Sequence, residues 1–491
     1  MSEPNTPGQF GRQLLRGSVW MIASRWAMRL IGLVSTMILA RLLTPEDFGL
    51  IAMVMLAYGL LETISYAGVD LALMRPGADT REHYDTAWTV QILQGLFIAA
   101  LMLLAAPFVA AYFSEPRLIA LIWFIAPRAI VDSLQNIGVV AFRKELDFAK
   151  EFRFTLYNKL LNFVFVIAAA LWFRNYWALV LGALTASCIG LVTSYVMHPY
   201  RPRLSLAKLG EIWGFSQWLM LSRVGAFFNR KVDSLLVGGM VGTTAMGNYH
   251  VASELATLPS SELVMPIRRA MFPNLAKITD QKQEFSAAVL SSFSAIAAMC
   301  LFVGFCLMSV APEFVAVVLG QRWMGAVPII QWLSLFGAFS ALVLVLEVPL
   351  WVVGKTNMSA AQTWFELAII LPLTWLAVRG WGVEGAAVAR AGVSVLMVPI
   401  MMLLTARYCN VGFGPLAAAL WRPLLAALAM AAVASQVPHL LNSALVTLLV
   451  KGALCFVLYP LLLLGLWVVA GRPAGFEPGA LAQLKKLFQK P

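Results

Sequence analysis

The chain has 491 residues, of which 60% are hydrophobic and only 12% are charged, and its mean hydropathy is +0.80. This composition excludes an ordinary soluble enzyme or binding domain and predicts a protein that crosses a membrane many times. The formal net charge of +12 suits the anionic inner leaflet of a membrane and gives no reason to invoke nucleic acid.

We expect an all-α fold, because each bilayer crossing needs about 20 mostly apolar residues in a helix. The first apolar run has a basic start, but it is about 24 residues long and contains Arg25 and Arg29, so we expect a retained helix rather than a cleaved signal peptide. About fourteen spans are predicted: 17–40, 47–74, 86–112, 117–140, 154–173, 176–198, 213–239, 243–266, 287–310, 326–353, 359–378, 382–406, 415–435 and 444–470.

The sequence contains an internal repeat. Residues 18–25 read Ser-x-Trp-x-x-x-Ser-Arg, and residues 216–223 carry the same pattern 198 positions later. Duplicated halves are common in secondary transporters, where the substrate lies between the repeats. The predicted parts are an N-terminal lobe (1–200), a C-terminal lobe (201–408), two further helices (409–474) and a cytoplasmic amphipathic tail (475–491).

Basic residues are divided unevenly between the loops on the two sides of the membrane. If both termini are cytoplasmic, 22 Lys and Arg residues, Arg268 and Arg422 among them, lie in inner loops and tails, and only five lie in outer loops. Basic loops remain in the cytoplasm. We therefore predict a multi-pass protein of the bacterial inner membrane with both termini inside.

The nine Lys and Arg residues that are not counted with the loops and tails are assigned to the predicted spans. On insertion scales such a residue costs about 2.5–3.5 kcal/mol near the helix centre, so it usually faces the bundle interior or a watery cavity. Arg25, Arg29 and Arg223 have no acid within one turn of their own helix, and we predict a positively charged cavity between the halves. Lys159 and Lys451 are given no role; the candidates for substrate binding are Arg25, Arg29, Arg128, Arg223, Arg230, Lys231 and Arg390.

Some of these cations have a purely structural explanation. Asp132 follows Arg128 by four residues and Asp233 follows Arg230 by three, spacings that allow local ion pairs. Lys451 lies near a predicted helix end, from which its long side chain can extend to the membrane surface.

Acidic residues inside the spans are candidates for ion coupling, since such groups form proton relays in transporters, although some can equally neutralise the arginines. A bend at Pro259 would suit gating, but proline is ordinary in membrane helices. The acids are Asp132, Glu262 and Glu384, together with the four that we single out for coupling, Glu62, Asp70, Asp233 and Glu254.

The sequence shows no pattern of a catalytic site. It has no phosphate-binding glycine loop, metal-binding constellation or nucleophile–base arrangement, and its five cysteines lack paired spacing. The segment Thr44-Pro-Glu46-Asp47 has the pattern of a turn-like cap rather than of a metal site. We therefore expect a protein that is not an enzyme and uses no cofactor or metal.

Several motifs in chain order resemble one family. They are Gly17-Ser-Val-Trp20, the turn 40–49, the loop 135–148, the segment 233–238 and the segment 346–354. Together they look like the polysaccharide-transport family of lipid-linked oligosaccharide flippases, which includes the Wzx-type exporters and belongs to the multidrug/oligosaccharidyl-lipid/polysaccharide superfamily. The resemblance covers nearly the whole chain.

The resemblance implies two six-helix lobes around a central cavity, two appended helices and transport by alternating access. It implies that Arg25, Arg29 and Arg223 bind the diphosphate or acidic sugars of a polyprenyl-linked repeat unit of O-antigen or exopolysaccharide. The expected partners are this lipid-linked glycan, membrane lipids, and the polysaccharide polymerase and glycosyltransferases that act on it.

Three alternatives remain open at this point. A glycan polymerase or ligase would need a large outer loop with clustered charges, and the predicted outer loops are short. An integral glycosyltransferase would carry metal-binding acids near an outer loop. An exporter of small molecules from the same superfamily would share the fold, which alone does not decide function; glycosyltransferases encoded beside this chain would favour the flippase.

Overall fold

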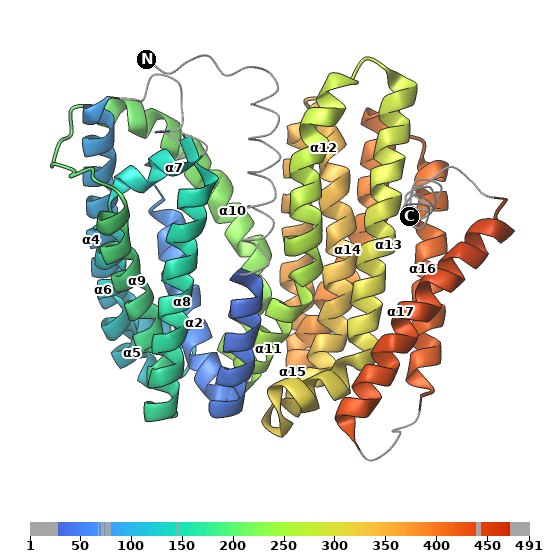
Figure 1. The fold of residues 1–491 in the computed structure, drawn as a ribbon, viewed down its shortest axis with the longest axis horizontal. Helices are drawn as coiled ribbons and strands as arrows, with labels where there is room; N and C mark the ends of the chain where they lie inside the picture. Colours follow the sequence, from blue (N-terminus) through green and yellow to red (C-terminus); the bar gives the residue numbers. More distant parts are fainter. Residues whose placement is uncertain are drawn as a thin grey trace, which may run out of the picture. The chain divides into compact units, whose positions relative to one another are not determined.

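A computed structural model describes residues 28–66, 68, 69, 73, 80–144, 147–437 and 443–471. In that part of the chain all regular structure is helical (Figure 1), which confirms the predicted all-α class. The Cα positions form two compact units. Unit 1 comprises Met1–Phe227 and Gly242–Thr244, and unit 2 comprises Phe228–Val241 and Ala245–Pro491.

Unit 1 contains a helical stretch at 28–42 and most of the following helices: α2 (Pro45–Ile64), α4 (Arg81–Tyr112), α5 (Arg117–Ile125), α6 (Pro127–Ser133), η1 (Ile137–Val139), α7 (Val140–Lys144), α8 (Phe148–Phe173), α9 (Trp177–Met197) and the first part of α10 (Leu209–Val241). Helix α4 packs against α2, α5 and α6. Helix α6 can approach α4 closely because residue 95 is a glycine. A Cβ atom at this position would collide with Ser133 and with the carbonyl oxygen of Ala129.

Unit 2 begins within α10 and continues through α11 (Thr243–Ala256), η2 (Pro259–Val264), α12 (Met265–Lys277), α13 (Lys282–Phe314), η3 (Val315–Leu319), η4 (Gln321–Ala326), α14 (Val327–Val352), α15 (Thr356–Tyr408), α16 (Phe413–Ser435) and α17 (Ala444–Val469). Its apolar core is built on α13, which packs against α14, α16 and α17. The two C-terminal helices are therefore part of the packing of this unit.

Nine helices in the described residues are long and apolar enough to span a membrane. One of them, α15, is two helices joined at a kink, where Gly382 adopts φ 59° and ψ −141°, a conformation open mainly to glycine. The kink separates the predicted spans 359–378 and 382–406. The other expected spans coincide with helical residues at 28–42, with α5 and α6, with α10, and with the run from α11 to α12.

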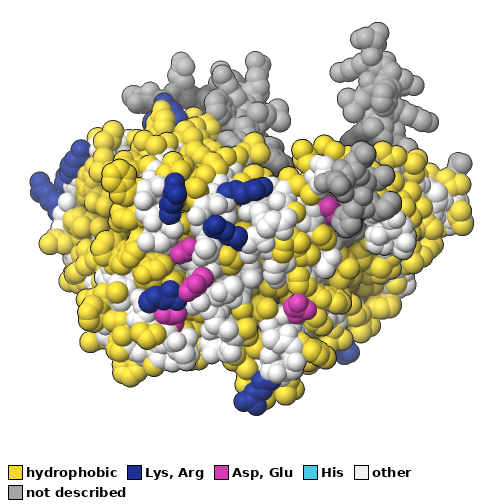
Figure 2. Space-filling model, turned by 90° about the horizontal axis from the view of Figure 1, so that it is seen from below, with side chains coloured by type: hydrophobic (Ala, Val, Ile, Leu, Met, Phe, Trp, Pro, Cys, Tyr) yellow, Lys and Arg dark blue, Asp and Glu magenta, His cyan; other side chains and the backbone are white. Residues whose placement is uncertain are grey.

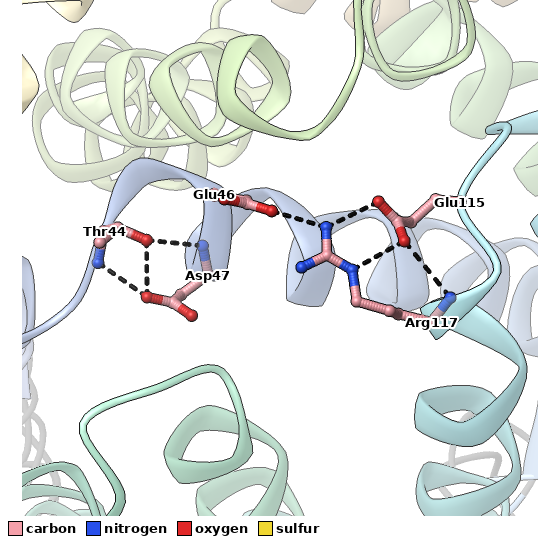
Figure 3. A network of polar contacts seen from close by, with 5 residues as sticks. All are labelled: Thr44, Glu46, Asp47, Glu115 and Arg117. Atoms are coloured by element: carbon pink, nitrogen blue, oxygen red, sulfur yellow. Dashed lines mark hydrogen bonds and ion pairs between the residues drawn. The ribbon is translucent and has the colours of Figure 1, made fainter.

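Polar contacts fix one end of α2 (Figure 3). The Thr44 hydroxyl accepts a hydrogen bond from the Asp47 amide, and the Asp47 side chain accepts one from the Thr44 amide at 2.9 Å. This capping box satisfies donors that a helix start leaves open and confirms the predicted cap. Arg117 donates to Glu46 at 2.6 Å and to Glu115 at 2.8 Å. The same guanidinium holds the pKa of the Glu115 carboxyl below its usual value, and it joins α2 to the turn between α4 and α5.

Apolar side chains predominate on the face drawn in Figure 2, with a few charged groups scattered among them. Many large apolar side chains of the spanning helices are exposed, among them Trp172, Val196 and Phe456. Such exposure suits a surface that meets lipid rather than water.

Candidate functional site

Unit 1 contains a partly open polar cavity of about 200 Å³ among α2, the residues that follow it, α4 and α6. One wall is formed by Gln91, Gln94 and Gly95 of α4, and an acid from each of the other two helices also lines the cavity. The polar side chains that line the cavity are Tyr58, Glu62, Tyr66, Gln91, Gln94, Asp132 and Ser133. A polar cavity within membrane-spanning helices is an uncommon feature that usually marks a pathway for a substrate or an ion.

An ion pair lies at the wall of this cavity. The Nε atom of Arg128 is 3.2 Å from Oδ2 of Asp132, and its guanidinium lies 5.1 Å from the centroid of the Tyr58 ring. Gln135 donates to the other carboxylate oxygen at 3.2 Å. The local pair that the spacing of Arg128 and Asp132 allowed is therefore present, and it orders the acid that lines the cavity.

Arg223 lies beside the same cavity. It belongs to the part of α10 in unit 1, and its Cζ atom is 3.5 Å from the centroid of the Tyr66 ring, which is also part of the lining. Glu62 of α2 is close enough to interact electrostatically with both Arg223 and Arg128. The sequence analysis searched for acidic partners of Arg223 only on its own helix. It therefore did not predict the interaction with Glu62, which lies on a different helix.

Arg29 lies elsewhere in unit 1, on the helical stretch 28–42. Its side chain is half-buried, and its Nε atom is buried without a hydrogen-bond partner. One turn later, a Cβ atom built on Gly32 would lie 3.9 Å from Nζ of Lys159 on α8. Lys159 of α8 thus lies against this stretch one turn beyond Arg29. The candidates Arg25 and Asp70 lie outside the described residues.

The charges of unit 2 form a separate buried cluster. Arg390, which is 4% exposed, donates to the Asn229 carbonyl at 2.8 Å, and its Nε atom is 3.7 Å from Asp233. The Tyr249 hydroxyl donates to the same carboxylate at 2.7 Å. The cation beside Asp233 thus comes from α15, whereas the sequence suggested Arg230. An acid already neutralised in this way is a poor site for a coupling ion.

The remaining predicted residues of unit 2 are more accessible. Arg230 and Glu254 are exposed, and Lys231 is half-buried. Among the other acids considered, Glu384 is exposed beside the α15 kink, and Glu262 lies in the π-helical turn η2 that starts at Pro259. The described residues contain no group of three or more His, Cys, Asp or Glu side chains that could hold a metal ion.

Three predictions about cations of unit 2 are wrong. Lys451 does not extend to the membrane surface: it is buried and lies 2.7 Å from Glu313 of α13, because α17 packs against that helix. Arg268 and Arg422, assigned to inner loops, are buried within α12 and α16. Prolines and paired arginines hid the helicity of the segment around Arg268, whereas Arg422 lies inside the predicted span 415–435 and should not have been counted with the loops.

The chain is similar in sequence to a known protein family and to several relatives. Residues 38–328 match the family model described as polysaccharide biosynthesis protein. A membrane protein of the cps region of Klebsiella pneumoniae is 23% identical over 381 residues, which cover 76% of this chain and 78% of that protein. The lipopolysaccharide biosynthesis protein WzxC of Escherichia coli is 24% identical over 331 residues, 66% of each chain.

A solved structure shares the fold. The lipid II flippase MurJ in an inward closed conformation superposes with a TM-score of 0.75 at 12% identity, covering 92% of this chain and all of that one. At this identity the likeness concerns the fold alone. Because the family model spans more than half of the sequence, the chain belongs to the polysaccharide biosynthesis protein family.

Proposed function

We propose that this protein is a flippase that moves a polyprenyl-diphosphate-linked oligosaccharide, a repeat unit of O-antigen or exopolysaccharide, across the bacterial inner membrane by alternating access. It belongs to a family of polysaccharide biosynthesis proteins, and one of the solved structures that share its fold is a lipid II flippase. It acts as a transporter and leaves its substrate chemically unchanged.

The observation that carries the proposal is the polar cavity of unit 1, with the Arg223 guanidinium beside it and the Arg128–Asp132 ion pair at its wall. A lipid-linked glycan needs its charged head carried past hydrocarbon while its tail stays in lipid. Arginine suits that head, because its guanidinium remains charged and binds phosphate through two parallel hydrogen bonds. Glu62 and Asp132 offset part of this charge, so binding stays modest and release remains possible.

The candidate residues divide into three groups in this proposal. Arg25, Arg29 and Arg223 bind the anionic head during transport. Arg128 and Arg390 each have a carboxylate beside them, and we assign them to positioning the helices of their own units. Arg230 and Lys231 remain further candidates for contacts with the glycan.

The proposal includes two lobes, at 1–200 and 201–408, with both termini and the loops 75–85, 143–153 and 201–208 in the cytoplasm. The excess of cations in these loops and tails is the support for this orientation. Reporter fusions test it: a phosphatase fused after Pro491 should be inactive, and a cytoplasmic reporter at the same place should be active. A phosphatase that is active there would overturn the orientation.

The function itself is tested by deletion of the gene in its host. Lipid-linked repeat units should then accumulate on the cytoplasmic face of the inner membrane, while the glycosyltransferases that build them and the polymerase that extends them remain present. Normal surface polysaccharide together with a changed tolerance of small toxic molecules would instead favour an exporter of small molecules.

A further inference from the structure

Two amides of α4 line the polar cavity of unit 1 and take no part in the ion pair at its wall. Gln91 and Gln94 lie within one turn of the helix, on the same face as Gly95. Because Gly95 lets α6 approach closely, the Gln91 side chain lies beside the backbone of Asp132 and donates to its carbonyl at 3.5 Å. A tight helix contact therefore positions both amides at the cavity.

These amides have hydrogen-bonding capacity to spare. The bond from Gln91 is long, and the described residues provide no partner for its carbonyl oxygen or for the amide of Gln94. Both side chains are half-buried in a helix that is long and apolar enough to span a membrane. A polar group in such surroundings is costly unless something binds it, and each amide offers a donor and an acceptor to a ligand.

The charges at the cavity do not suit a diphosphate inside it. The described residues that line it include two acids, Glu62 and Asp132, and no Lys or Arg. Both acids would repel a phosphate group placed among them. The Arg223 guanidinium, which the proposed function assigns to the diphosphate, lies beside the lining, 3.5 Å from the Tyr66 ring centroid. The cavity itself therefore suits an uncharged group that is rich in hydrogen-bonding atoms.

The size of the cavity suits a single sugar. Its volume of about 200 Å³ is smaller than the roughly 300–1,000 Å³ of pockets that hold a drug-sized ligand, so it has no room for a whole repeat unit. Tyr66 both lines the cavity and carries the Arg223 guanidinium on its ring. With the diphosphate at Arg223, the sugar that reaches the cavity is the one joined directly to it.

We propose that the cavity of unit 1 is a subsite for the sugar joined to the diphosphate, and that Gln91 and Gln94 select this sugar by binding its hydroxyl or acetamido groups. The inference rests on the proposed function for its lipid-linked substrate. A site that hydrogen-bonds a substrate group discriminates strongly against a ligand without that group, because its own polar atoms are then left unpaired. The protein thus distinguishes repeat units by their first sugar.

A metal cation fits the cavity less well than a sugar. The guanidinium of Arg128 lies 3.2 Å from Asp132 and would repel a metal ion at that carboxylate. Within the described residues, no group of three or more His, Cys, Asp or Glu side chains could hold such an ion. A sugar needs no charge from the protein and can use the two amides directly.

Gln94→Leu is the most informative substitution. It keeps the approximate size of the side chain, removes its donor and its acceptor, and breaks no hydrogen bond within the described part of the protein. Gln91→Leu is the second variant. Its matched control is Gln331→Leu, because Gln331 of α14 is also half-buried and also donates to a backbone carbonyl at 3.5 Å, that of Met308.

Equilibrium binding of two lipids separates the sugar from the diphosphate. The purified full-length protein in lipid nanodiscs is titrated with undecaprenyl diphosphate, which carries no sugar, and with the lipid-linked repeat unit extracted from a strain that lacks the gene. Gln94→Leu and Gln91→Leu should each weaken binding of the repeat-unit lipid about tenfold and leave binding of the sugar-free lipid unchanged. Gln331→Leu should bind both lipids like the wild-type protein, and Arg223→Ala should weaken the binding of both.

Three results would overturn the sugar subsite: equal affinity of the wild-type protein for the two lipids, wild-type affinity of Gln94→Leu for the repeat-unit lipid, or an equal loss of affinity for both lipids in that variant. The proposed function would survive each of them, because the protein would still bind the lipid through Arg223. A wild-type protein that binds neither lipid would contradict the proposed function and the subsite together. If one of the two glutamine variants does not fold, the other decides.

Discussion

Arg223→Ala is expected to abolish glycan export while leaving a near-normal amount of folded protein in the membrane. The side chain is exposed and rests on the Tyr66 ring beside the cavity, so its loss removes a binding group without leaving a buried charge unpaired. Arg223→Lys should retain part of the export, because the charge survives but the planar fork that binds phosphate through two bonds is lost.

Complementation of a deletion strain measures export, and immunoblotting of membranes measures the amount of protein. Arg379→Ala is the matched control, since Arg379 makes the same kind of contact, 3.8 Å from the Trp375 ring centroid, but lies in unit 2 on α15. It should export normally. A purely structural role for Arg223 predicts less folded protein with normal transport per molecule, and full export by Arg223→Ala would remove this arginine from the mechanism.

The second large effect concerns stability. Lys451→Ala is expected to destabilise unit 2 by about 3–5 kcal/mol, the usual cost of removing one partner of a buried ion pair. Its Nζ atom is 2.7 Å from Glu313, whose side chain is 2% exposed. The double substitution Lys451→Met with Glu313→Gln should recover much of the stability, because it removes both charges.

Thermal unfolding of the detergent-purified protein measures this change. Lys355→Ala is the control: that lysine is exposed and lies 5.7 Å from the Tyr408 ring centroid, and exposed substitutions usually change stability by about 0.5 kcal/mol or less. If Lys451→Ala melts like the wild-type protein, the pair contributes nothing to folding.

Much of the fold follows from hydrophobic run length. The predicted spans coincide with helices wherever the structure describes them, and the cap at Thr44 follows from local chemistry. Helix α12 was not predicted, because its prolines and its two adjacent arginines are typical of a loop. Its helicity depends on packing against α14, which the local sequence does not encode.

Charge partners were predictable only within one helix. The spacing of Arg128 and Asp132 predicts their contact, since four residues bring two side chains to one helix face. Arg390 contacts Asp233, which lies 157 positions earlier in the sequence, and Glu313 and Lys451 are also far apart in the chain. Such pairs depend on which helices pack together. An acid deep in an apolar run, such as Glu313, is the signal that could have pointed to such a pair.

The most direct test of the central claim is a reconstitution of transport. The purified full-length protein is placed in vesicles with a polyprenyl-diphosphate-linked oligosaccharide confined to the inner leaflet, and the glycan that reaches the outside is measured with a membrane-impermeant sugar-binding protein. The account predicts that the wild-type protein exposes the glycan and that Arg223→Ala leaves it inside, as in protein-free vesicles. Wild-type vesicles that expose no more glycan than protein-free ones would contradict it.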